Sequence, residues 1–72
     1  MKVCPFCQQD IVWHARLKSD LNYNFLMCFE CDSVWLADQP VSDQAGTTFE
    51  AHMKAGARAP DWADIEKREP IE

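Results

Sequence analysis

The chain has 72 residues, a formal net charge of −5 and four cysteines. It can form one small domain, and domains of this size often need a metal ion or disulfide bonds because their hydrophobic core alone adds little stability. No apolar run approaches the roughly 20 residues of a membrane-spanning helix, and the acidic balance disfavours long-range attraction to nucleic acid.

The N-terminal stretch MKVCPFC contains no apolar segment typical of a secretory signal peptide. We therefore expect a cytoplasmic protein without a membrane partner. In a reducing cytosol, paired C-x-x-C motifs are metal sites more often than disulfides.

Alternating polarity in residues 11–17 predicts a half-buried β-strand. The loop-forming residues of segment 18–24 predict a hairpin, 23–28 a returning strand and 33–36 a third short strand. One face of the first strand would carry Ile11, Trp13, Ala15 and Leu17, and the other Val12, His14 and Arg16, continued by Lys18. The first half is therefore expected to be a three-stranded antiparallel unit with both C-x-x-C turns at one end.

The second half predicts a polar loop and then helices. Segment 37–46 contains Pro40 and Gly46 and is typical of a loop. Thr47 lies three residues before Glu50, the spacing of a capping box, which predicts a helix ending near Gly56. A short second helix is expected after Pro60, with Asp61 as its N-cap, Trp62, Ile65 and the Lys67 methylenes facing inward, and Pro70 as its stop.

The cysteines form a C-x-x-C pair, twenty intervening residues and a second C-x-x-C pair. Two residues between cysteines fold the backbone into a tight knuckle whose amides point at the sulfurs, and two facing knuckles make a tetrahedral site. The spacing predicts one structural Zn²⁺ bound by Cys4, Cys7, Cys28 and Cys31.

Three other uses of these cysteines are weighed against zinc. A rubredoxin-like iron site needs the same thiolates, but the chain lacks the compact aromatic fold expected around it. A thioredoxin-like redox pair needs a C-x-x-C at a helix start, whereas both pairs here are expected between strands. Two disulfides would suit an exported protein, which the missing signal peptide disfavours.

The two knuckles and the Val34-Trp35-Leu36 run, CPFC…CFECDSVWLAD, resemble the transcription-factor-type zinc-ribbon family of small bacterial proteins over about residues 1–38. The resemblance implies a ribbon with four metal ligands, but not a role in transcription, because the scaffold is reused. The family usually has glycine after each knuckle, where this chain has Gln8 and Asp32. Asp tolerates a left-handed backbone better than Gln does.

We therefore predict a small metal-bound α+β domain. Residues 1–37 would form a zinc ribbon of two to three antiparallel strands with two CxxC knuckles. Residues 38–72 would form an acidic loop followed by one or two short C-terminal helices, packed on the ribbon within one structural domain. The acidity is concentrated in this second segment.

The remaining polar residues do not predict an enzyme or a small-molecule substrate. His52 is expected to be exposed on the helix. The pairs Asp61/Asp64 and Glu66/Glu69 share the i, i+3 spacing of one helix face, which is more typical of a solvated surface than of acid–base catalysis. His14, Arg16 and Lys18 would form a small basic strip, a weak footprint for nucleic acid.

Aromatic residues divide between core and surface. Trp13 and Trp35 are expected in the core with Leu17, Phe25 and Leu36, whereas Trp62 is either a core pin or an exposed anchor. The favoured function is a non-enzymatic protein-interaction module for a partner with a basic surface, in one form an inhibitor or immunity-type protein against a basic toxin or nuclease. Its contact residues would be Phe6, Phe29, Trp62, Asp61, Asp64 and Glu66. Alternatives are binding of nucleic acid or the transcription machinery, and redox or metal delivery by the cysteines.

Overall fold

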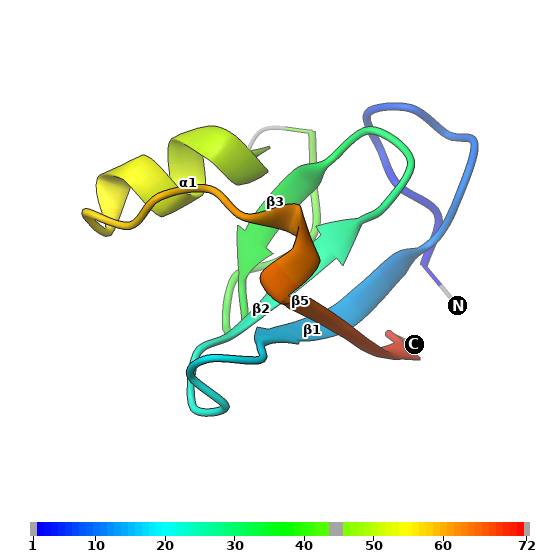
Figure 1. Ribbon diagram of the computed structural model, residues 1–72. Helices are drawn as coiled ribbons and strands as arrows, with labels where there is room; N and C mark the ends of the chain where they lie inside the picture. Colours follow the sequence, from blue (N-terminus) through cyan, green and yellow to red (C-terminus); the bar gives the residue numbers. More distant parts are fainter. Residues whose placement is uncertain (1, 44–45, 72) are drawn as a thin grey trace.

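A computed structural model describes residues 2–43 and 46–71 of the chain. This part forms a five-stranded antiparallel sheet with one short α-helix (Figure 1). The elements in chain order are β1 (Val12–Leu17), β2 (Asn24–Cys28), β3 (Ser33–Leu36), β4 (Thr47–Thr48), α1 (Phe49–Ala55), the 3₁₀ turn η1 (Trp62–Asp64) and β5 (Ile65–Pro70). Within the described residues, no helix has the length and apolarity needed to cross a membrane.

The predicted three-stranded unit is confirmed. Strands β1, β2 and β3 are successive antiparallel neighbours, with Val12 opposite Cys28 and Met27 opposite Val34. The polar segment between β1 and β2 is a hairpin loop, in which the Asp20 carboxylate accepts a hydrogen bond from the Asn22 amide at 3.2 Å. The second C-x-x-C pair lies at the end of β2 and in the turn that follows, so this register positions half of the cysteine site.

The second half adds both edge strands, and the sheet order is β4-β3-β2-β1-β5. Residues 1–37 therefore contribute three strands as predicted, whereas the second half, predicted as a loop and helices, extends the sheet to five. The predicted second helix is wrong: only η1 is helical, and residues Ile65–Pro70 pair with β1 as β5.

Strand β5 forms because the backbone groups on the outer edge of β1 would otherwise be unpaired. Ile65 lies opposite Leu17 and is buried with it, while Lys67 places its ammonium 4.2 Å from the centre of the Trp13 ring. These long-range contacts override the helical spacing of Trp62 and Ile65, which local sequence alone cannot distinguish from a strand.

Helix α1 begins one residue later than the predicted capping box. Thr47 belongs to β4, and the N-cap is Thr48, whose hydroxyl accepts a hydrogen bond from the Ala51 amide at 3.2 Å. Gly56 is the C-cap as predicted, but the left-handed residue that follows the helix is Ala57, with φ of 57°.

The sheet is buried on both faces, because neighbouring residues of β2 enter two different clusters. The helix-side cluster consists of Ala15, Leu17, Phe25, Met27, Val34, Phe49, Met53 and Ile65. The cysteine-side cluster consists of Cys4, Val12, Leu26, Cys28 and Trp35. Val12, predicted on the polar face of its strand, is therefore fully buried.

Three further predicted placements of side chains are wrong. Trp13 is half-buried and belongs to neither core cluster. Leu36 is 52% exposed rather than in the core, because the chain turns back immediately after it and the Gln39 amide donates to its carbonyl. His52 is buried rather than exposed, because the apolar face of the short helix is wide enough to include it beside Phe49 and Met53. Its Nε2 lies 2.9 Å from the Tyr23 hydroxyl, and burial lowers the pKa of His52.

Gly46 closes the loop that covers Trp35. It has a φ of +101°, and a Cβ added there would lie 2.6 Å from the Trp35 indole nitrogen. The same nitrogen donates a hydrogen bond to the Ser42 carbonyl at 3.1 Å. The loop therefore requires glycine both for its backbone conformation and for this close approach.

We expect Gly46→Ala to lower the free energy of unfolding by about 2 kcal/mol, because it forces a methyl group into Trp35 in a strained backbone conformation. Urea-induced unfolding of the metal-loaded protein measures the effect. Gly56→Ala is the matched control, since its Cβ would meet nothing closer than 3.7 Å and Gly56 has a φ of −91°. Equal stabilities of the two variants would contradict the argument.

Candidate metal centre

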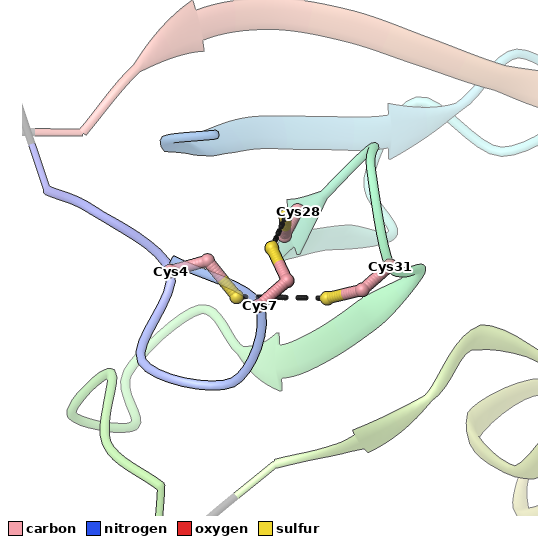
Figure 2. A group of neighbouring side chains, drawn as sticks. All are labelled: Cys4, Cys7, Cys28 and Cys31. Atoms are coloured by element: carbon pink, nitrogen blue, oxygen red, sulfur yellow. Dashed lines mark hydrogen bonds between the residues drawn. The ribbon is translucent and has the colours of Figure 1, made fainter. Parts of the chain in front are cut away.

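The four cysteines meet at one end of the sheet, although they come from three parts of the chain. Cys4 and Cys7 lie in the loop before β1, Cys28 ends β2 and Cys31 lies in the turn before β3. Figure 2 shows their sulfur atoms converging on one point.

The sulfur geometry suits a single metal ion. All four sulfur atoms lie within 4.8 Å of one another. The Cys4–Cys31 and Cys7–Cys28 sulfur pairs are each separated by 3.6 Å. A tetrahedral ion with metal–sulfur bonds near 2.3 Å separates its ligands by about 3.8 Å. The cysteines are therefore positioned to coordinate one metal ion.

Both knuckles have the same backbone design. In the first, the Gln8 amide donates to the Cys4 carbonyl at 3.0 Å, and in the second the Asp32 amide donates to the Cys28 carbonyl at 2.9 Å. Gln8 and Asp32 have φ of 55° and 61°, so each chain reversal ends on a left-handed residue.

Burial and backbone amides act in opposite directions on the thiols. Burial raises the pKa of Cys4, against hydrogen bonds from the Cys7 and Phe6 amides that lower it. Burial likewise raises the pKa of Cys28 to about 12, against amides of its own knuckle. The Gln9 amide is the main cause that lowers the pKa of Cys7 to about 7.

The buried thiols therefore need a cation beside them to stay ionised, whereas the amides are already oriented toward thiolates. This donor set fits Zn²⁺, which structural sites commonly bind through four thiolates in a closed tetrahedron, and it would equally hold iron.

Ser33 is a neighbour of the site that the motif did not reveal. Its hydroxyl lies 3.1 Å from the Cys31 sulfur, and the residue is buried on β3. The Asp32 carbonyl accepts a hydrogen bond from the Phe49 amide at 2.9 Å, which joins the second knuckle to the start of α1. Such outer contacts orient metal ligands. In the sequence, the only signal for this role of Ser33 was a polar residue two positions after Cys31.

The geometry bears on two of the alternative uses of the cysteines. None of the four forms a disulfide, and sulfur separations of 3.6 Å are far longer than an S–S bond of about 2.05 Å. Neither C-x-x-C pair lies at the start of a helix in the described residues. The arrangement is thus unlike that of a thioredoxin-type redox pair.

The predicted aromatic contact residues do not share one surface environment. Phe6 is 47% exposed and stacks on Trp35 with ring centres 5.7 Å apart. Trp62 is also 47% exposed, edge to face with Phe49 at 4.9 Å. Phe29 is half-buried against the helix-side cluster, with the Lys67 ammonium 5.2 Å from its ring centre.

The predicted acidic contact residues do not lie on one helix face, because that helix does not form. Asp61 is exposed and caps η1 through a 3.0 Å hydrogen bond from the Ala63 amide. Asp64 accepts hydrogen bonds from the Ser19 amide, at 3.0 Å, and from the Ser19 hydroxyl.

Glu66 forms an ion pair with Arg16, its partner across β1 and β5. This hydrogen bond from Arg16 lowers the pKa of Glu66. In the predicted basic strip, the Arg16 charge is therefore balanced by Glu66 within the protein. His14 and Lys18 form no ion pair among the described residues.

Comparisons with protein-family models, curated proteins and solved structures gave no match. The zinc-ribbon resemblance therefore stays a prediction, and the functional argument depends on the residues themselves.

We expect the protein purified under reducing conditions to contain one zinc ion per chain, and complete chelation to abolish its cooperative thermal transition. A structural Zn²⁺ contributes on the order of 10 kcal/mol in small domains, which a core of this size cannot replace. Elemental analysis and circular dichroism melts measure both quantities.

Cys28→Ser should behave like the chelated protein, whereas Ser33→Ala should keep its metal with an affinity about 10-fold lower. Iron in place of zinc, or a cooperative transition that survives chelation, would contradict the prediction.

We also expect Gln8→Gly to stabilise the metal-loaded protein by about 1 kcal/mol, because glycine adopts the left-handed conformation without steric cost. The gain corresponds to a rise in Tm of roughly 4–8 °C for a domain of this size. Gln9→Gly is the control, because Gln9 has no positive φ and glycine retains the amide that faces Cys7. The prediction fails if Gln9→Gly raises Tm as much as Gln8→Gly.

Proposed function

We propose that the protein is a non-enzymatic protein-interaction module whose fold is held by one structural Zn²⁺. The observation that carries this proposal is the convergence of four cysteine sulfurs from one chain. Four thiolates complete the coordination of zinc and leave no position for water or substrate, so such an ion supports the fold rather than chemistry.

The zinc would close a ribbon formed by the two knuckles and strands β1 to β3. The matching left-handed residues Gln8 and Asp32 support this assignment, since they occupy the positions that the family usually fills with glycine. The helix and the two edge strands would then be additions that enlarge the surface available to a partner.

The partner is expected to be a protein with a basic surface. The formal net charge is −5, and a zinc ion with four thiolates would lower it by two more units. Such a charge accelerates association with cationic partners and opposes binding to nucleic acid. Phe6 and Trp62, both 47% exposed, offer apolar area for the contact. In its sharper form, the module inhibits a basic toxin or nuclease by covering it.

Affinity capture tests the proposal. The zinc-loaded protein is immobilised and exposed to lysate of its host, with and without nuclease treatment, and retained proteins are identified by mass spectrometry. Chelated protein serves as the control bait. We expect one dominant basic protein that survives nuclease and elutes at high salt, and that binds with micromolar or tighter affinity when purified.

Loss of the retained material on nuclease treatment would favour the nucleic-acid alternative. Absence of any basic protein with micromolar affinity would overturn the proposal. For a captured toxin or nuclease, titration of its activity with the module tests the inhibitor form directly.

A further inference from the structure

A groove lies between the second knuckle, the first turn of α1 and η1. Its walls include Cys31, Asp32, Phe49, Glu50, Lys54 and Trp62, and its volume is about 440 Å³. That volume falls within the range of about 300–1,000 Å³ typical of binding pockets. We call it the Trp62 groove. It is distinct from the metal centre, although Cys31 contributes to both.

Trp62 presents a rigid aromatic surface to this groove. Its ring is held edge to face by the buried Phe49, with ring centres 4.9 Å apart, yet 47% of the residue is exposed. The turn that carries it is fixed at both ends, by the Asp61 cap and by the hydrogen bond from the Lys18 amide to the Asp64 carbonyl at 2.7 Å. A preorganised exposed tryptophan loses little conformational entropy on binding.

The groove is also negatively charged. Glu50 is paired with Lys54 at 2.9 Å, so these two charges balance. Asp32 forms no ion pair with any cation of the described residues. A zinc ion bound by the four thiolates behind the Cys31 wall would add two negative charges. The net field at the groove therefore favours a cation.

An aromatic face and an unpaired carboxylate that line the same groove are the combination that recognises a guanidinium group. Arginine stacks on tryptophan through its planar cation and forms forked hydrogen bonds with a carboxylate. Lysine presents a compact, strongly hydrated charge and gains less from stacking.

We propose that the Trp62 groove binds an arginine side chain of the basic partner, stacked on Trp62 and paired with Asp32. This inference rests on the proposed function, and it names the place where a positive charge of the partner binds. Phe6, Phe29 and Glu66 are not part of this contact.

The first test uses a seven-residue peptide with one central arginine flanked by glycine and serine, blocked at both ends. It is titrated into zinc-loaded, ¹⁵N-labelled protein while the three tryptophan indole resonances are followed by NMR. The same peptide with citrulline, which has arginine's shape without its charge, is the control.

We expect saturable movement of the Trp62 resonance with arginine, and at least 10-fold weaker binding with citrulline. The Trp13 and Trp35 resonances should move little. Equal binding of the two peptides, no binding, or movement centred outside the groove would overturn the inference.

Variants separate the groove from the rest of the surface. Asp32→Asn keeps the shape and the tolerance of a left-handed backbone, and Trp62→Leu removes the aromatic face. Each should weaken arginine binding at least 10-fold, whereas Leu21→Ala, at an exposed apolar residue of the β1–β2 hairpin loop, and Asp43→Asn should change it less than 2-fold. Zinc content and thermal melts establish that each variant is folded. Because Asp32→Asn is the milder change, it decides the question if Trp62→Leu does not fold.

The same variants distinguish this inference from the proposed function. A captured basic partner that binds Asp32→Asn and Trp62→Leu as tightly as the parent protein would place docking elsewhere, and would overturn the groove while leaving the module's function intact. Binding of the arginine peptide in the groove, with no basic protein captured, would support the groove and overturn the proposed function.

Discussion

The rest of the structure depends on the closure of two knuckles around one point. Cys4 and Cys28 are fully buried and belong to the same cluster as Val12, Leu26 and Trp35. Their burial raises the pKa of both thiols, so an ionised site needs a cation at its centre. A metal ion there would both satisfy the thiolates and join the N-terminal loop to the β2–β3 turn.

The second knuckle also organises the C-terminal half. The Asp32 carbonyl accepts the Phe49 amide, and Phe49 in turn supports the Trp62 ring. The helix start and the exposed tryptophan are therefore connected to the second knuckle through two successive contacts. Loss of the metal is expected to disorganise the candidate contact surface as well as the core.

Charged residues have two different roles in this protein. Some charged residues hold the fold together: Arg16 pairs with Glu66 across β1 and β5, and Arg58 pairs with Asp20 at 3.2 Å and lies over the Tyr23 ring. Others, including Asp32 and Asp61, have no cationic partner among the described residues. Only charges of the second kind remain available to a binding partner, which is why net charge alone could not locate the contact.

The sequence by itself determined the site and the strands nearest to it. Spacing identified Cys4, Cys7, Cys28 and Cys31 as one group. Alternating polarity located β1, and the hairpin loop and the β-branched and aromatic residues that follow located β2 and β3, because all these signals depend on neighbouring residues. The tertiary structure alone decided the rest. Ile65–Pro70 became a strand because the free edge of β1 was available, and His52 became buried because its ring packs against Phe25 and Tyr23. Those outcomes depend on backbone pairing and packing between residues far apart in the chain, which no local pattern records.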